Sequence, residues 1–160
     1  MKRALRNTLV FAGCMPLILS IAVRSVFWGK ENTIRAVGPS LTRAAKRSLR
    51  YWVPDIRDAS QFDDFKKSMK RNFALWRILY DVDIVEDSQD TFKIQVRNCP
   101  FCEVFTFVGL SGLNKYICKA DWEIAEDNRG KWQFARNCTI GAGDPFCDHT
   151  YRREAPTQNR

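Results

Sequence analysis

The sequence has one histidine and only one Cys-x-x-Cys motif among its 160 residues. Structural zinc sites need four cysteine or histidine ligands, which usually come as two closely spaced pairs. Cys99-x-x-Cys102 has no second pair, so a zinc-stabilised module is not favoured. Ligands for one zinc ion are nevertheless present, since Cys118, Cys147 and His149 accompany that pair. We expect no cofactor and no bound metal, and zinc is kept as the secondary alternative.

A cleavable secretion signal is also missing. Lys2, Arg3 and Arg6 precede an uncharged run of sixteen residues from Thr8 to Val23, but no Ala-x-Ala-like cleavage site follows. Disulfides form mainly in oxidising compartments, so we expect a cytoplasmic protein with reduced thiols. The run is shorter than the roughly 20 residues that cross a bilayer. Residues 1–28 are therefore predicted to form an apolar helix, either a buried core helix or a weak anchor that would make the protein membrane-associated.

Acidic residues are nearly absent from the first third of the chain. Residues 1–54 carry ten Lys/Arg against Glu31 alone, whereas residues 55–160 carry sixteen basic against seventeen acidic residues. A basic end can attract anionic lipid or nucleic acid. No nucleic-acid-binding motif accompanies it, so no nucleic-acid partner is expected. The expected partner is a small-molecule substrate, and residues 1–28 leave a membrane surface as a candidate. The sequence does not indicate an oligomeric state.

Internal repeats and low-complexity tracts are absent as well, and the periodicity of apolar residues predicts one α+β fold. Helices are predicted first, then two strands, two short helices and two final strands. The predicted ranges are helices 7–28, 32–52, 60–80, 100–108 and 112–127, and strands 81–86, 91–98, 131–140 and 146–153. This order predicts N-terminal helices packed on a small antiparallel sheet, with a two-helix insertion between hairpins.

The predicted organisation is a single domain over residues 29–153, preceded by the apolar helix and followed by a polar tail at 154–160. Pro16 lies inside the first helix and is expected to kink or break it. Gly38-Pro39 interrupts the second helical pattern, which could therefore form two shorter pieces.

Five of the six cysteines and the histidine lie between Asn98 and Tyr151. Cys118 and Asp121 share a helix face because they are three residues apart. Alternation along the last strand points Cys147 and His149 one way and Asp148 the other. A thiolate at Cys99 is favoured by a helix N-terminus. The candidate catalytic residues are Cys99, Cys118, Asp121, Cys147, Asp148 and His149.

Three chemistries are open to this set. A thiolate could attack an electrophilic carbon while an aspartate or the histidine moves protons. Asp121 or Asp148 could instead activate water, or the thiols and the histidine could hold zinc. The remaining cysteines are interpreted as small buried residues; they are Cys14, Cys102 and Cys138.

Three short motifs resemble those of the L-2-amino-thiazoline-4-carboxylic acid hydrolase family, in the same order and at similar spacing over residues 25–153. They are Asn98-Cys99-Pro100, Cys118-Lys119-Ala120-Asp121, and a C-terminal signature of Arg136-Asn137-Cys138-Thr139-Ile140, Gly143-Asp144 and Cys147-Asp148-His149-Thr150-Tyr151. Within this signature Asn137, Thr139 and Asp144 are the candidate substrate-binding residues. Asn137 stands where the family commonly has threonine, although asparagine can also donate and accept hydrogen bonds.

The resemblance implies hydrolysis of a non-peptide carbon–nitrogen bond in a cyclic amidine. The family's named reaction opens the ring of 2-amino-thiazoline-4-carboxylate to an N-carbamoyl-cysteine, on the way to L-cysteine. The alternative is a non-enzymatic module that binds a small molecule or zinc, similar to domains of the 4-vinyl-reductase type, which also carry late cysteine and glycine motifs.

Overall fold

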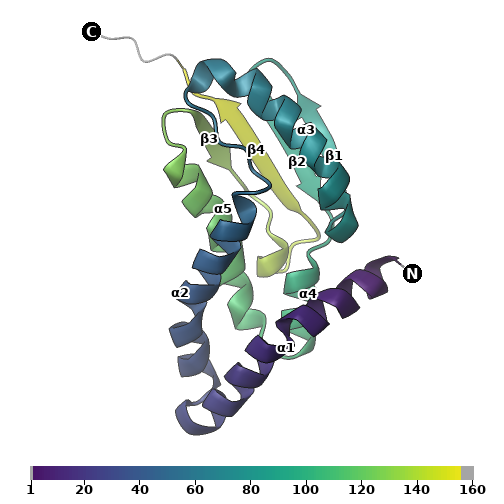
Figure 1. The fold of residues 1–160 in the computed structure, drawn as a ribbon, viewed down its shortest axis with the longest axis vertical. Helices are drawn as coiled ribbons and strands as arrows, with labels where there is room; N and C mark the ends of the chain where they lie inside the picture. Colours follow the sequence, from purple (N-terminus) through teal and green to yellow (C-terminus); the bar gives the residue numbers. More distant parts are fainter. Residues whose placement is uncertain (1, 156–160) are drawn as a thin grey trace.

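The computed structural model describes residues 2–155, which form five α-helices and one four-stranded sheet (Figure 1). The helices are α1 (Lys2–Trp28), α2 (Lys30–Leu49), α3 (Phe62–Leu79), α4 (Pro100–Phe107) and α5 (Asn114–Asp127). The strands are β1 (Val82–Asp87), β2 (Thr91–Val96), β3 (Trp132–Ala135) and β4 (Cys147–Arg153). They lie in the order β1-β2-β4-β3, and every neighbouring pair is antiparallel. The predicted α+β class is confirmed.

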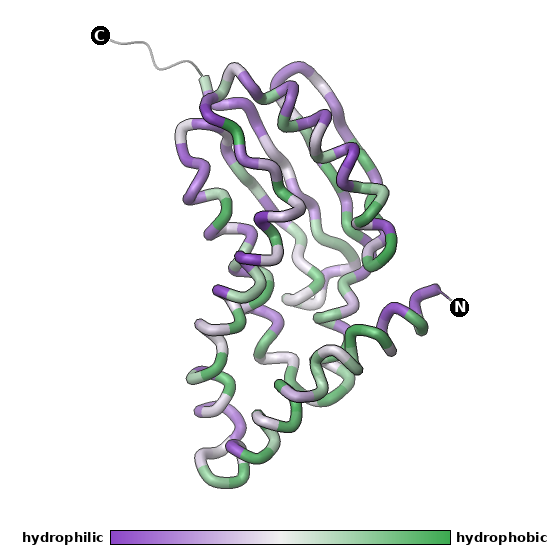
Figure 2. Tube along the Cα trace, viewed as in Figure 1, coloured by the Kyte–Doolittle hydropathy of each residue, from purple (hydrophilic) through white to green (hydrophobic). Residues whose placement is uncertain are grey.

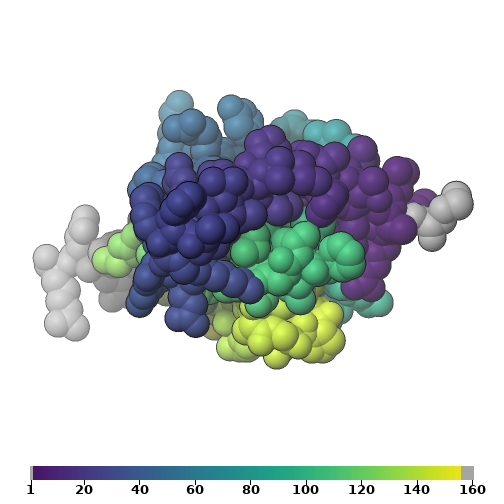
Figure 3. All heavy atoms as spheres, turned by 90° about the horizontal axis from the view of Figure 1, so that it is seen from below, coloured from purple at the N-terminus to yellow at the C-terminus, as the bar shows by residue number. Residues whose placement is uncertain are grey.

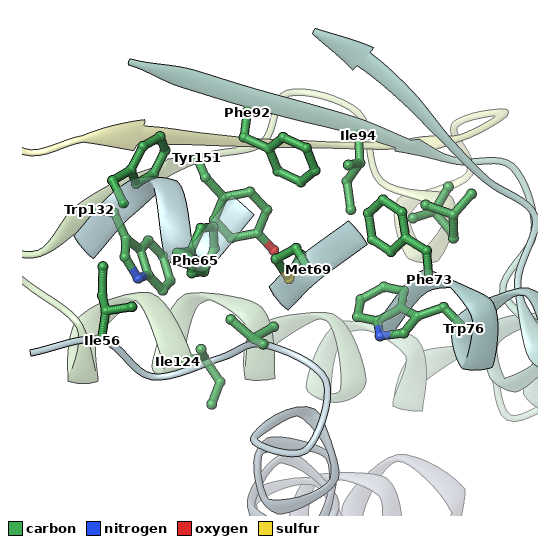
Figure 4. Packing of buried hydrophobic residues seen from close by; sticks show 14 of the residues in the cluster. Ile56, Phe65, Met69, Phe73, Trp76, Phe92, Ile94, Ile124, Trp132 and Tyr151 are labelled. Atoms are coloured by element: carbon green, nitrogen blue, oxygen red, sulfur yellow. The ribbon is translucent and has the colours of Figure 1, made fainter. Parts of the chain in front are cut away.

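The main core lies between α3 and one face of the sheet (Figure 4). Phe65 and Met69 of α3 are fully buried, and the Phe65 ring lies 5.2 Å from the ring of Tyr151 on β4. In the β2–β4 ladder Ile94 is opposite His149, and Val96 is opposite Cys147. Directly opposed residues project to the same side of a sheet. The alternation predicted for β4 therefore places Cys147, His149 and Tyr151 on the helix-covered face.

Helix α1 crosses the end of the molecule remote from β3 and packs on α2 and α4, while α2 runs beside α5 (Figure 1). A second, smaller core joins these elements through Ile21, Ile34, Phe105 and Leu113. The inner face of α1 is therefore buried against the protein, but the helix is not enclosed. The space-filling view of this end shows α1, in purple, lying against the green segment that contains α4 (Figure 3).

Neither proline ends its helix. α1 continues through Pro16, because a proline inside a helix removes one backbone hydrogen bond and the packed inner face holds the flanking turns together. α2 likewise continues through Gly38 and Pro39 as one helix, so the two shorter pieces that the sequence left open do not form. Gly38 has a packing role, since a Cβ there would overlap the ring of Tyr116 on α5.

Candidate active site

A cavity of about 340 Å³ lies between α2, α3, α5 and the adjoining ends of β2 and β4. Most of its wall is apolar, from residues such as Leu49, Trp52, Trp76, Val96 and Phe101. Its polar and thiol-bearing residues gather where α4, α5 and β4 approach one another, and they are Cys99, Cys118, Asp121, Arg136, Cys147 and His149. The fold thus brings together five of the six predicted catalytic residues, leaves out Asp148, and adds Arg136.

Cys118 has the environment of a reactive thiolate. A hydrogen bond from the Cys102 thiol lowers the pKa of Cys118, and the nearby Arg136 guanidinium and the Gly141 N–H act in the same direction. Burial and the Asp121 carboxylate oppose this effect. The neighbouring thiols of Cys118 and Cys99, together with burial, raise the pKa of Cys102. Cys102 is 2% exposed. Its burial agrees with the interpretation as a packing residue, and its thiol also lies beside those of Cys99 and Cys118.

The sequence offered a weak signal for this placement of Cys102. Cys99 is the N-cap of α4, and Pro100 occupies the first turn as predicted. Cys102 follows Cys99 by three residues, so both face the same side of the first turn of that helix. The spacing alone could not show that α5 would bring Cys118 to the same place.

Arg136 forms the charged centre of the site. Its side chain is only 5% exposed, and its Nη1 lies 2.5 Å from Oδ2 of Asp121. Its Nη2 donates to the Cys118 carbonyl at 3.0 Å, and the guanidinium lies 5.9 Å from the centre of the Trp122 ring. In the strand predicted over residues 131–140, alternation puts Arg136 on the same face as Trp132 and Phe134. A charge on that apolar face was the signal that could have identified it.

His149 lies in the cavity wall as a neutral imidazole. Burial lowers the pKa of His149, and the neighbouring Asp121 opposes this effect only in part. Its Nε2 is 4.0 Å from Oδ2 of Asp121. Neither ring nitrogen has a hydrogen-bond partner within residues 2–155. A buried imidazole in this state can accept a proton from a bound molecule, and the Asp121 carboxylate would stabilise the imidazolium that forms.

Cys147 differs from Cys118 although both line the cavity. Burial raises the pKa of Cys147 to about 12, even though the Ile140 N–H donates to its sulfur at 3.2 Å. Cys147 is therefore a protonated thiol at neutral pH.

Asp148 and Asp144 hold the loop between β3 and β4. Oδ1 of Asp148 accepts the N–H groups of Asn137 at 2.8 Å and of Cys138 at 2.6 Å, and Oδ2 of Asp144 accepts the Thr139 N–H at 2.6 Å. Burial alone would raise the pKa of Asp148, but these N–H groups outweigh it and lower the pKa. Both carboxylates thus bind backbone and do not line the cavity. The loop that they hold begins directly after β3. The strand therefore ends at Ala135, whereas the sequence predicted a strand to residue 140.

The other two candidate substrate-binding residues, Asn137 and Thr139, also lie outside the main cavity. Asn137 is exposed on the loop. Thr139 lines a second hollow of about 390 Å³. Cys118 and Arg136 line this hollow as well as the main cavity. Lys115 and Lys119 of α5 also line this hollow. Cys118 and Arg136 therefore separate an apolar cavity from a basic, more open recess.

The thiols of the site are unpaired, and all six cysteines of the chain are free. Within the described part of the chain, no three side chains of cysteine, histidine, aspartate or glutamate are arranged to hold a metal ion.

The family model for L-2-amino-thiazoline-4-carboxylic acid hydrolase matches residues 7–151. The chain belongs to this family. The match includes most of α1, so the similarity begins earlier than the motifs from residue 25 onward indicated. It also contains every residue of the cavity wall named above. The family name is that of a hydrolase, and none of the curated proteins matches the sequence.

The Cys102→Ala substitution is expected to raise the pKa of Cys118, because it removes the hydrogen bond that stabilises the thiolate. The rate of Cys118 alkylation by iodoacetamide, followed by peptide mass spectrometry across a pH series, should then reach its midpoint at a higher pH. Cys138→Ala is the matched control, since Cys138 lines neither hollow. An unchanged midpoint in Cys102→Ala would show that Cys102 does not act on Cys118.

The Gly141→Ala substitution is expected to disturb Cys118 directly. A Cβ at this position would lie 2.6 Å from Sγ of Cys118 and 3.3 Å from Cβ of Asn114. Overpacking of this kind costs about 1–3 kcal/mol, so we expect a lower melting temperature and slower Cys118 alkylation. The control is Gly13→Ala on α1, where an added Cβ meets nothing within 4 Å. Equal alkylation rates in the two variants would contradict the close approach.

Proposed function

We propose that the protein is a thiol-dependent hydrolase that opens the ring of a cyclic amidine, 2-amino-thiazoline-4-carboxylate or an analogue of it. The proposal is carried by one observation, the meeting of Cys118, Asp121, Arg136 and His149 in the wall of one cavity. The amidine carbon of such a ring is bonded to two nitrogens and one sulfur, so it is electrophilic. Membership of a hydrolase family supports the reaction class.

In this proposal the Cys118 thiolate attacks the amidine carbon of the amidinium ring. The ring bond from that carbon to sulfur or nitrogen then breaks, the departing atom takes a proton from the amidinium, and the opened substrate stays bonded to the Cys118 sulfur through the amidine carbon. The lowered pKa of Cys118 supports this role, because the thiolate is the nucleophilic form. The Asp121 carboxylate binds the amidinium N–H groups. Arg136 holds that carboxylate in place, and its further N–H donors suit the carboxylate of the substrate. These contacts would align the ring carbon with the sulfur.

His149 then takes a proton from the water that releases the covalent adduct. Its neutral state and its unpartnered nitrogens support a general-base role. The water adds to the amidine carbon, Cys118 leaves as a thiolate, and the product retains the carbamoyl group. Cys147 stays protonated and shapes the wall. Asp148 acts at a distance from the reacting atoms by holding the loop that places Gly141 against Cys118.

The identity of the broken ring bond can be read from the product. Cleavage of the carbon–sulfur bond gives N-carbamoyl-cysteine, with a free thiol, so the family's named product requires this bond to break and not the ring carbon–nitrogen bond that was expected from the resemblance. Cleavage of the ring carbon–nitrogen bond gives the S-carbamoyl isomer, with a free amine. Both products contain one added water, so mass alone does not separate them, and thiol and amine reagents do.

Replacing Cys118 with serine is expected to lower kcat on 2-amino-thiazoline-4-carboxylate by on the order of 100-fold or more, because the nucleophile is lost. Product formation is measured by mass spectrometry with thiol and amine detection. The control is Cys138→Ala, which should stay within about twofold of the natural protein. Unchanged activity in Cys118→Ala would disprove the thiol mechanism. Stoichiometric metal lost on mutating Cys147 would favour the binding-module alternative.

The apolar wall further supports a substrate that carries an apolar group. Pockets of about 300–1,000 Å³ bury drug-sized ligands, and this cavity of about 340 Å³ falls in that range. A single small ring with a carboxylate would leave Leu41, Trp52 and Trp76 without a partner. We therefore propose that the ring is substituted with an aliphatic or aromatic group that packs on α2 and α3.

The Ala45→Trp substitution tests this substituent, because Ala45 of α2 lines the cavity. A tryptophan there should lower kcat/KM for an aryl-substituted amidine by about tenfold or more, which corresponds to a lost contact of about 1.4 kcal/mol. The kcat/KM for unsubstituted 2-amino-thiazoline-4-carboxylate should fall less. Ala36→Trp is the control, since Ala36 is exposed on the same helix. Equal losses for the two substrates in Ala45→Trp would contradict an apolar substituent.

A further inference from the structure

Helix α1 presents an apolar face to solvent along its whole length. Large apolar residues recur on this face at helical spacing, with small residues and Pro16 between them. With their exposed fractions they are Leu5 (62%), Leu9 (58%), Leu19 (57%), Val23 (61%) and Phe27 (78%). We call these five residues the outer stripe. Soluble monomers rarely expose a contiguous apolar patch larger than a few hundred Å².

The long uncharged stretch of α1 is typical of a segment that contacts a membrane. No charged residue occurs between Arg6 and Arg24, and the apolar character of the helix is visible over most of its length (Figure 2). Among residues 2–155, α1 is the one helix long and apolar enough to cross a membrane, and only 11% of its most apolar window is buried. Val26 and Trp28 extend the exposed apolar surface to the corner with α2.

Both ends of α1 are nevertheless tied to the folded domain. The Arg6 guanidinium donates to the carbonyls of Ile78 at 2.7 Å and Arg77 at 2.6 Å, and it pairs with Asp81 at 2.7 Å. Near the other end, Ile21 is fully buried in the core that contains Phe105. A helix that turned to cross a bilayer would have to give up both attachments. A helix that lies flat on the surface of a bilayer keeps them.

The charges around α1 suit an anionic surface. The basic residues of α1 and α2 that form ion pairs do so toward the protein, as Arg3 does with Glu103 and Lys46 does with Asp127. Lys2 at one end of the helix and Arg24 beyond the uncharged stretch are exposed. Exposed basic residues that flank an exposed apolar helix face are attracted to anionic lipid headgroups, while the apolar face enters the interface.

We propose that α1 docks the protein in the plane of an anionic lipid bilayer, with the outer stripe inserted at the level of the headgroups. The helix does not span the bilayer, and the catalytic domain stays on one side of it. This surface is separate from the cavity, so the proposal does not depend on the proposed hydrolase activity.

The test is cosedimentation of the full-length protein with vesicles of phosphatidylcholine that contain phosphatidylglycerol. The natural protein should bind, and the Leu9→Asp/Val23→Asp double variant should bind at least roughly tenfold more weakly, because both side chains would carry charge into the interface. Leu75→Asp on α3 is the matched control, since Leu75 is 55% exposed on a different helix. Binding should also weaken in about 0.5 M salt, which screens the headgroup attraction.

Folding and orientation are checked in the same samples. Far-UV circular dichroism establishes that the double variant is folded, and Leu19→Asp/Phe27→Asp provides an independent pair on the same face. An alkaline carbonate wash should release the bound protein, as it does with proteins that lie on the surface. Absence of vesicle binding by the natural protein, binding by the folded stripe variants that equals that of the natural protein, or retention after the wash would each overturn the proposal. So would a stable lipid-free dimer that the stripe substitutions dissociate.

Discussion

The buried guanidinium of Arg136 is the constraint on which the site depends. A charge that is 5% exposed must be matched by an opposite charge and by hydrogen bonds, and removing one partner of such a pair costs about 3–5 kcal/mol. Asp121 and the Cys118 carbonyl supply these partners, and both belong to α5. The end of β3 is thereby joined to the helix that carries Cys118. The same positive charge also helps to lower the pKa of Cys118.

The loop between β3 and β4 is the second part of this arrangement. The carboxylates of Asp148 and Asp144 satisfy backbone N–H groups that no strand partner could reach. The loop can then turn back, so that Gly141 lies directly against the Cys118 sulfur. Cys118, Cys102 and Cys147 are chemically identical residues, yet only Cys118 has a lowered pKa. Hydrogen-bond direction and burial make the difference.

The two faces of helix α1 have different surroundings. Its inner face contributes Ile21 to a core, and its outer face stays apolar without a protein partner. A helix that is hydrophobic all round is usually enclosed on all sides. Here α1 packs on α2 and α4 at one end of the molecule (Figure 1), and within the described residues the side chains of the outer stripe stay 57–78% exposed.

The sequence by itself determined what local periodicity can specify. It indicated the helices, the strands, the shared face of Cys118 and Asp121, and the common direction of Cys147 and His149, because side-chain direction repeats every two residues in a strand and about every 3.6 in a helix. The motifs also identified the family. Only the tertiary structure decided which groups meet. It brought Arg136 and Cys102 into the site and turned Asp148 toward backbone N–H groups, because desolvation and pairing depend on contacts between residues that are far apart in the chain.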